Sequence, residues 1–243
     1  MMKTMEIDLL NKKMPHVGLL LDSTVMFGGV GFVMGLPIIN LSGSDAQKKE
    51  WIPKIQSGEI TTCYGQTELG HGSDIQSLET TAVYNEQDET FTINTPSVSS
   101  YKWWPGDMGL ASNYVIVYAR VFSLGKYRGM YPLFFQVRDM VTHKLFPGVE
   151  GGDIGPKLGF STVNNGYMAF HKYKVPRTSL LSRYSEVYKD GSFEIKGDTR
   201  AYYSAMMVIR QGITIALPIW MMNSILIALR YSYVRTQFKP QKS

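Results

Sequence analysis

The pattern of hydrophobic and polar residues along the chain changes at Ile60. The first sixty residues are predicted to be helical. Ser44 and Gln47 have the spacing of a capping box, in which each side chain bonds the backbone of the other at a helix start. A short helix is therefore predicted over residues 46–55, ending near Gly58.

Short runs of β-branched and aromatic residues after Ile60 predict strands. The predicted strands span residues 78–84, 90–94, 114–121, 131–137 and 168–175. The polar stretch 85–89 between the first two predicts a hairpin, and the Pro- and Gly-rich segment 147–159 is predicted to form turns.

Helical spacing returns near residue 199 and is expected to continue, unevenly through Gly212 and Pro218, to about residue 238. Four apolar side chains in this helix have the spacing of a buried face. They are Ile225, Leu226, Leu229 and Tyr233. The order of helices, strands and a final helix predicts an α+β protein.

Composition is that of an ordinary folded protein. The chain has 243 residues, of which 44% are hydrophobic and 19% charged. Its net charge of +5 comes from scattered basic residues without a dense tract, so nucleic-acid binding is not expected.

Residues 17–41 are the one stretch that resembles a transmembrane helix, but Asp22, five glycines and Pro37 favour buried, closely packed helices, and no membrane span is predicted. Residues 1–14 match neither a secretory signal nor an Arg-rich transit peptide. The single cysteine, Cys63, excludes an internal disulfide and fits a reducing compartment. We expect it to be a small strand residue rather than a reactive thiol, because no basic residue flanks it.

Two short motifs carry the candidate chemistry. Residues 63–74 are dense in hydrogen-bonding side chains spaced by glycines, which let a backbone approach a ligand closely. Residues 102–106, Lys-Trp-Trp-Pro-Gly, place two large flat rings beside a turn, where a broad planar cofactor could pack. Taken alone, the first motif is more typical of a plain loop than of a ligand site, and the tryptophan pair is more typical of a buried core than of a cofactor platform.

Together, in this order and about forty residues apart, the motifs resemble the flavin-binding β-domain of the acyl-CoA oxidases, relatives of the acyl-CoA dehydrogenases. Five further segments agree with that pattern. They are residues 78–82, 152–159, 165–167, 174–177 and 230–235. The resemblance implies a partial N-terminal helical domain at residues 1–60, a β-barrel-like flavin domain at 61–185 and the first long helix of a C-terminal bundle within 186–243.

The resemblance also implies roles for individual residues. Thr67 matches a position at the edge of the isoalloxazine ring of FAD, and Gly106 matches a second flavin contact. The two tryptophans are expected beside the ring system or in the core of the β-domain. Residues 71–74 match the mouth of the site near thioester and coenzyme A, and Arg235 matches an arginine that reaches the flavin of a partner subunit.

The implied reaction is the FAD-dependent oxidation of a fatty acyl-CoA by O2 to trans-2-enoyl-CoA and hydrogen peroxide, in fatty-acid β-oxidation. The family's catalytic glutamate lies far downstream, and Glu68, Glu79 and Glu150 do not match it. No catalytic residue and no metal ligand is therefore assigned. We expect the 243 residues alone to lack normal oxidase activity and to act as a homodimer or with a partner chain that supplies a C-terminal half.

Two alternatives remain at this point: a non-catalytic, oxidase-derived scaffold or assembly subunit, and an acyl-CoA dehydrogenase. The Lys-Trp-Trp-Pro-Gly motif and residues 152–156 favour the oxidase branch. The scattered basic residues either serve solubility or meet the phosphates of coenzyme A. The resemblance implies a peroxisomal location, with the mitochondrion as the alternative, although the chain ends in Gln-Lys-Ser and not in a Ser-Lys-Leu type of signal.

Overall fold

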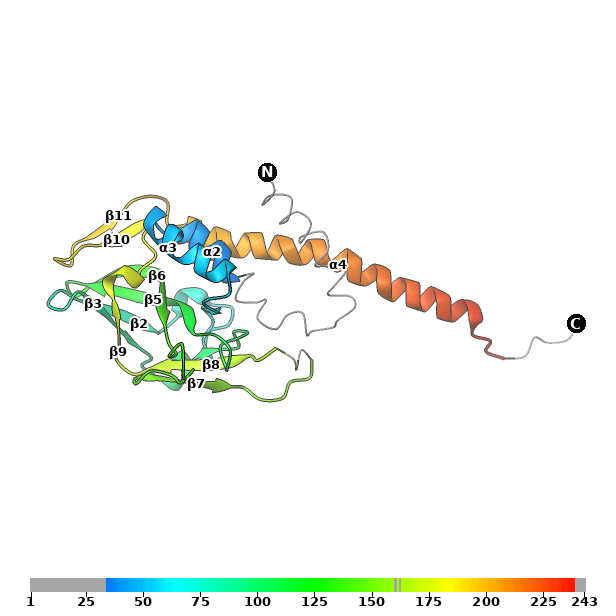
Figure 1. Ribbon diagram of the computed structural model, residues 1–243. Helices are drawn as coiled ribbons and strands as arrows, with labels where there is room; N and C mark the ends of the chain where they lie inside the picture. Colours follow the sequence, from blue (N-terminus) through cyan, green and yellow to red (C-terminus); the bar gives the residue numbers. More distant parts are fainter. Residues whose placement is uncertain (1–33, 160, 162, 239–243) are drawn as a thin grey trace, which may run out of the picture. The chain divides into compact units, whose positions relative to one another are not determined.

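The computed structural model of the protein describes residues 34–159, 161 and 163–238 (Figure 1). The chain divides into two compact units, residues 23–205 and residues 1–22 with 206–243. The described helices are α2 (Leu36–Ser42), α3 (Asp45–Gln56) and α4 (Ala201–Val234), and strands occupy much of the chain between α3 and α4. The α+β prediction is confirmed.

The larger sheet is a curled half-barrel of six strands in which β5 is the centre. Its strands are β1 (Thr62–Gly65), β2 (Thr81–Asn85), β3 (Thr90–Asn94), β5 (Tyr114–Ser123), β6 (Lys126–Gln136) and β9 (Tyr173–Pro176). The order is β1-β5-β2-β3-β9, with β6 also paired to β5. β1 and β2 run parallel to β5, and the other pairs are antiparallel.

A second sheet of three strands has the order β4-β8-β7. Its strands are β4 (Lys102–Trp103), β7 (Val149–Asp153) and β8 (Gly166–Phe170). A separate hairpin joins β10 (Ser185–Val187) to β11 (Phe193–Ile195), and short 3-10 turns lie at Ile75–Ser77, Val98–Ser100 and Arg177–Ser179.

The hydrophobic core lies between the two sheets. Phe135 of β6 and Phe170 of β8 meet edge to face at 5.5 Å between ring centroids. The opposite face of the larger sheet is covered by α3, where the Trp51 ring lies 5.4 Å from Tyr114 and 5.3 Å from Phe134 (Figure 1). Because both faces are covered, β5 is buried along most of its length.

The predicted capping box is present at the start of α3. The Ser44 hydroxyl accepts from the Gln47 amide, and Gln47 Oε1 accepts from the Ser44 amide at 2.9 Å. Gln47 is buried, and its Nε2 also donates to the carbonyls of Thr178 and Leu180. The Gln47 side chain thus caps the N-terminus of α3 and also hydrogen-bonds α3 to residues 178 and 180 beside β6.

The strand predictions for residues 78–84, 90–94, 114–121 and 131–137 are confirmed as β2, β3, β5 and β6, with shifted ends, and β2 and β3 form the predicted hairpin. The strand predicted at residues 168–175 is two strands, β8 and β9, which belong to different sheets. The chain turns between them at Lys172, whose φ of 54° ends the extended run.

Two strand pairs lie where the sequence does not predict them. β7 crosses the region predicted to form turns, and its glycines fit because a Cβ on Gly152 would lie 3.1 Å from the Tyr167 ring. β10 and β11 lie in the segment assigned to the start of the C-terminal helical domain. Pairing with a partner strand outweighs the weak local propensity at both places.

Helix α4 ends at Val234 instead of near residue 238, and Pro218 lies inside it. The predicted buried face of α4 is wrong for the described residues, since its members are 46–92% exposed. An amphipathic spacing buries a helix face only where another element covers it. Residues 17–33 of the candidate membrane segment lie outside the described residues, and within the described part of the chain no helix is long and apolar enough to span a bilayer.

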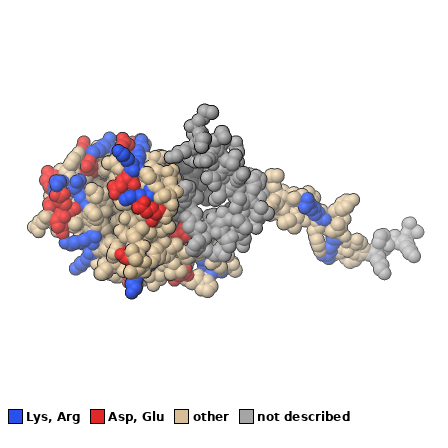
Figure 2. All heavy atoms as spheres, viewed as in Figure 1, with Lys and Arg blue, Asp and Glu red and all other residues tan. Residues whose placement is uncertain are grey.

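Acidic and basic side chains are intermixed, mainly toward the left and top of the sheet-containing unit in Figure 2, and the visible face has no broad patch of one sign. This distribution agrees with the scattered charges in the sequence, and it differs from the basic stripe that is typical of nucleic-acid-binding surfaces.

Candidate functional site

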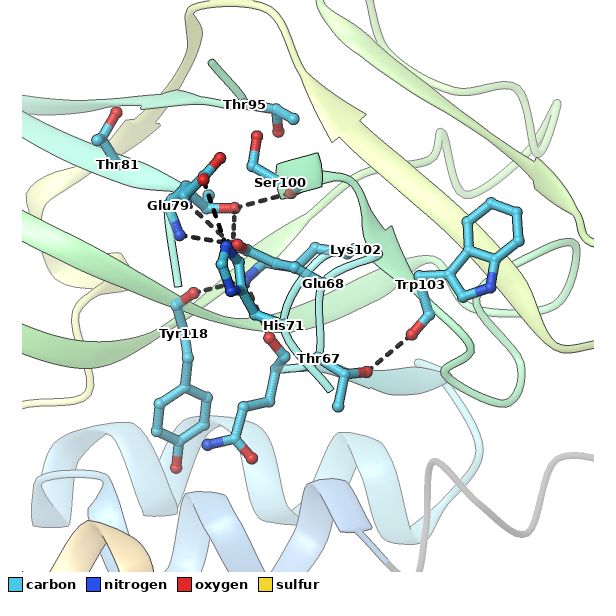
Figure 3. A network of polar contacts seen from close by, with 12 residues as sticks. Thr67, Glu68, His71, Glu79, Thr81, Thr95, Ser100, Lys102, Trp103 and Tyr118 are labelled. Atoms are coloured by element: carbon cyan, nitrogen blue, oxygen red, sulfur yellow. Dashed lines mark hydrogen bonds and ion pairs between the residues drawn. The ribbon is translucent and has the colours of Figure 1, made fainter. Parts of the chain in front are cut away.

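The two sequence motifs lie side by side and are bonded to each other (Figure 3). The Trp103 amide donates to the Thr67 carbonyl at 3.1 Å, and the Thr67 hydroxyl donates to the Trp103 carbonyl at 2.7 Å. Further along the same two segments, the Leu69 amide donates to the Tyr101 carbonyl at 2.9 Å. The loop after β1 and strand β4 therefore form one short antiparallel ladder that contains both proposed flavin-contact segments.

The first motif leaves β1 and folds back on itself at Glu68 and His71, whose backbones exchange hydrogen bonds of 3.0 and 3.3 Å. Thr67 is half-buried at the start of this turn, and residues 72–74 are exposed. A Cβ on Gly72 would meet nothing within 4 Å, so open space lies beside this part of the loop.

A fully buried ion pair lies beneath the ladder. Lys102 Nζ is 3.0 Å from Glu68 Oε1, and neither side chain is exposed to solvent. Burial lowers the pKa of Lys102 to about 8, and the neighbouring Glu68 carboxylate opposes that shift. Glu68 was expected in the flavin loop, but its pairing with Lys102 was not predicted from the sequence.

Trp103 of the second motif belongs to a partly exposed row of stacked rings and not to the core. The Trp103 ring stacks on Tyr167 of β8 at 5.9 Å and 24°, and Tyr167 stacks on Tyr101 at 6.4 Å and 23°. Trp103 is half-buried, while 56% of Trp104 is exposed. A flat, partly exposed aromatic surface of this kind suits a planar ligand.

The turn after Trp103 is conformationally strained. Trp104 has φ 84° and Asp107 has φ 66°, in the left-handed region that bulky residues rarely adopt. Asn165 Nδ2 donates to the Trp104 carbonyl at 2.7 Å, and the Trp104 amide donates to the Gly166 carbonyl at 2.9 Å. Strained backbone that is over-determined by its surroundings is common at ligand sites.

Position 166 must be a glycine because its backbone packs closely against the turn that follows Trp103. A Cβ there would lie 2.1 Å from the Gly109 nitrogen, a distance that backbone atoms do not allow. This contact explains why position 166 of the segment 165–167 is a glycine. Gly106 itself is buried in the turn and is not among the glycines with positive φ, so its backbone angle does not demand glycine.

Arg138 is a structural residue of the site that was not predicted from the sequence. Its buried guanidinium donates from Nε to the Ser112 carbonyl at 3.1 Å and from Nη2 to the Gly109 carbonyl at 2.7 Å. These bonds hold the far end of the strained turn. An arginine directly after a predicted apolar strand is the signal that could have indicated it.

Cys63 lies fully buried in β1, and burial raises the pKa of its thiol to about 12. A thiol that stays protonated at neutral pH is a poor nucleophile. The prediction of a small strand residue is confirmed.

The two other glutamates considered as a base, Glu79 and Glu150, are engaged in hydrogen bonds. Glu79 Oε2 accepts from Ser97 at 2.6 Å and Ser99 at 2.9 Å, and Glu79 Oε1 lies 3.3 Å from His71 Nε2. The hydrogen bonds from Ser97, Ser99 and His71 lower the pKa of Glu79. Glu150 Oε2 accepts from Tyr101 at 3.2 Å and lies 2.9 Å from His171 Nε2.

Arg235 follows directly on α4 and is exposed. Its Nη1 donates to the Tyr231 hydroxyl at 2.8 Å, and the guanidinium lies 5.7 Å from the centroid of the same ring. Its contact with the flavin of a partner subunit stays a prediction. Within the described residues, no group of three His, Cys, Asp or Glu side chains is placed to hold a metal ion.

No protein-family model matches the chain. Individual relatives do match it. The chain is 39% identical over 211 residues to acyl-coenzyme A oxidase acox-1.1 of Caenorhabditis elegans and 37% identical over 209 residues to peroxisomal acyl-coenzyme A oxidase 1 of Phascolarctos cinereus. These matches cover 87% and 86% of this chain.

This chain belongs to the acyl-CoA oxidase family. Its fold agrees: acyl-CoA oxidase-2 of C. elegans, solved with FAD, ascaroside-CoA and ATP, superposes with a TM-score of 0.86 at 34% identity, over 97% of this chain and 38% of that one. The family members are much longer, since the chain spans 31% and 32% of the length of the two curated relatives.

Proposed function

We propose that this chain supplies the flavin-binding β-domain of an acyl-CoA oxidase that uses FAD. The observation that carries the proposal is the reciprocal pairing of Thr67 with Trp103, which joins the two motifs of the family pattern into one partly exposed site. In this proposal residues 61–185 are the flavin domain, preceded by a helical part at 1–60 and followed by the start of a helical domain at 186–243.

The residues of the ladder fit a flavin. Thr67 donates its only hydroxyl proton to the Trp103 carbonyl, so the oxygen offers lone pairs to an N–H group at the ring edge. The half-buried Trp103 and exposed Trp104 offer flat apolar surface, and open space lies beside Gly72. Thr67 and Gly106 would hold the isoalloxazine. When bound, FAD supplies the redox chemistry.

The proposed substrates are a fatty acyl-CoA and molecular oxygen, and the proposed products are trans-2-enoyl-CoA and hydrogen peroxide, as in fatty-acid β-oxidation. Removing the α-proton of a thioester requires a carboxylate base with freedom to accept it. Glu68 is buried in an ion pair, and Glu79 and Glu150 are held by hydrogen bonds, so no base is assigned among them. We propose that the base comes from outside this site, with the chain acting as a homodimer or with a partner chain.

The names of the curated relatives support a peroxisomal location, which we propose for this protein. They give no support to the mitochondrion.

The deciding experiment is to purify the protein, add FAD and record the absorption spectrum and the dissociation constant. We expect a yellow complex with a perturbed flavin spectrum. If no flavin absorbance stays with the protein after free FAD is removed, for the chain alone and with a co-expressed C-terminal half of a relative, the proposal is contradicted. If flavin binds, oxygen-dependent peroxide release from acyl-CoA supports the oxidase, whereas reduction of an electron-transfer flavoprotein indicates a dehydrogenase.

A further inference from the structure

The Lys102 side chain connects three separate parts of the fold. It starts in β4 of the smaller sheet, and its ammonium group donates to the Gln66 carbonyl at 3.2 Å, to Glu68 Oε1 at 3.0 Å and to the Tyr118 carbonyl of β5 at 2.8 Å (Figure 3). An ammonium group has three protons, so its donor capacity is fully used. Lys102 therefore links the loop after β1, the smaller sheet and the centre of the larger sheet.

Glu68 is held as completely as its partner. Its Oε1 accepts from the Thr80 amide at 3.0 Å, the Thr80 hydroxyl at 2.5 Å and Lys102. Its Oε2 accepts from the Glu79 amide at 2.7 Å. A buried carboxylate with this many donors is fixed in position, and the backbone on either side of it is fixed as well.

The pair lies directly between the groups that face the proposed ligand. Thr67 precedes Glu68, Trp103 follows Lys102, and these two neighbours share the reciprocal hydrogen bonds of the ladder. Since one residue on each strand is locked by the buried pair, the side chains next to them are held in register. A buried ion pair adds little to folding stability, because the cost of removing both charges from water offsets most of their attraction. Stability alone therefore does not explain why this pair is present.

We propose that the buried Glu68–Lys102 pair is a positioning device that sets the Thr67 hydroxyl and the Trp103–Gly106 segment against the flavin. The proposal rests on the proposed flavin function, but it also makes a claim about the unliganded chain: the register of the ladder depends on the pair.

The test uses the double variant Glu68→Gln/Lys102→Met, which removes both charges together and leaves no lone buried ion. Two measurements are made on the full chain. The first is the FAD dissociation constant with the flavin absorption spectrum, and the second is amide hydrogen exchange of Trp103 and Leu69 without FAD. We expect FAD binding to weaken about tenfold or more, with a changed spectrum, and both amides to exchange faster while β5 and β6 stay protected.

The matched control is Gln47→Leu, which removes a buried hydrogen-bonding side chain on α3, outside the ladder. It is expected to lower the melting temperature without changing the FAD dissociation constant or the exchange of Trp103. This comparison separates positioning from a general loss of stability.

A folded double variant with parental FAD affinity, or with parental exchange at Trp103 and Leu69, overturns the proposal. If the double variant does not fold, Thr80→Val decides. It removes the single hydroxyl proton of Thr80, which lies 2.5 Å from Glu68 Oε1 and 3.2 Å from the Ser100 carbonyl as measured from the hydroxyl oxygen. Parental affinity and exchange in Thr80→Val overturn the proposal, and a several-fold loss with faster exchange supports it. If the unsubstituted chain binds no FAD, the flavin function fails, while the exchange data still decide the register claim.

Discussion

The Thr67 hydroxyl donates a 2.7 Å hydrogen bond to the carbonyl of Trp103, 36 residues away in the sequence. The bond fixes the direction of the hydroxyl, because the proton is committed to the backbone and only lone pairs remain for a ligand. It also joins the loop after β1 to strand β4. Thr67, the residue proposed to contact flavin, therefore also holds these two segments of the site together.

The first prediction concerns that hydroxyl. Thr67→Val is nearly isosteric but leaves the Trp103 carbonyl without this partner, which costs about 1–3 kcal/mol for a buried polar group. We expect FAD to bind about tenfold more weakly, with the circular dichroism unchanged. Thr67→Ser keeps the hydroxyl and should bind FAD nearly as the parent does. Equal affinity in the parent and Thr67→Val removes Thr67 from the site.

The second prediction concerns the glycine that packs against the strained turn. Gly166→Ala places a Cβ 2.1 Å from the Gly109 nitrogen, and both groups are backbone-anchored. We expect unfolding stability to fall by about 1–3 kcal/mol or more, measured by urea denaturation. The control is Gly159→Ala, whose Cβ meets nothing within 4 Å. Similar losses in the two variants contradict the packing argument.

The third prediction is a pH dependence at Glu79. Hydrogen bonds hold the folded pKa of this carboxyl below its ordinary value of 4.5. Stabilisation from a lowered acid pKa is present above the ordinary value and is lost as pH falls through the folded pKa. Glu79→Gln should therefore melt about 1–2 °C below the parent at pH 7, and the gap should close as the pH falls below 4.5.

The exposed residue Glu59 provides the control for that measurement. Glu59→Gln should follow the parent melting curve across the same pH range. A gap for Glu79→Gln that does not shrink as the pH falls below 4.5 contradicts the assignment of the effect to the ionised carboxylate.

The fourth prediction concerns the link between α3 and the sheet. Gln47→Leu removes the capping-box acceptor and leaves the Thr178 and Leu180 carbonyls without their side-chain donor. We expect a loss of about 2–4 kcal/mol, since a helix cap and a buried hydrogen-bonding group are lost together. Gln56→Leu makes the same change at an exposed position of the same helix and should stay within about 0.5 kcal/mol of the parent.

Local signals predicted the parts of the fold that depend on neighbouring residues. The capping box of Ser44 and Gln47 and the β2–β3 hairpin follow from spacing within a few residues, and both are present. β7 and the separation of β8 from β9 were missed, because the strand partner that stabilises each one lies elsewhere in the chain.

By itself, the sequence determined the α+β order, the family and the two motifs that contain Thr67 and Gly106, because these depend on residue identity and local spacing. The tertiary structure alone decided that Glu68 and Lys102 form one buried pair, that Trp104 is exposed, and that Gly166 packs against Gly109. These contacts join residues distant in the chain. Their energies depend on burial and on distances of a few ångströms, and both exist only once the sheets have packed.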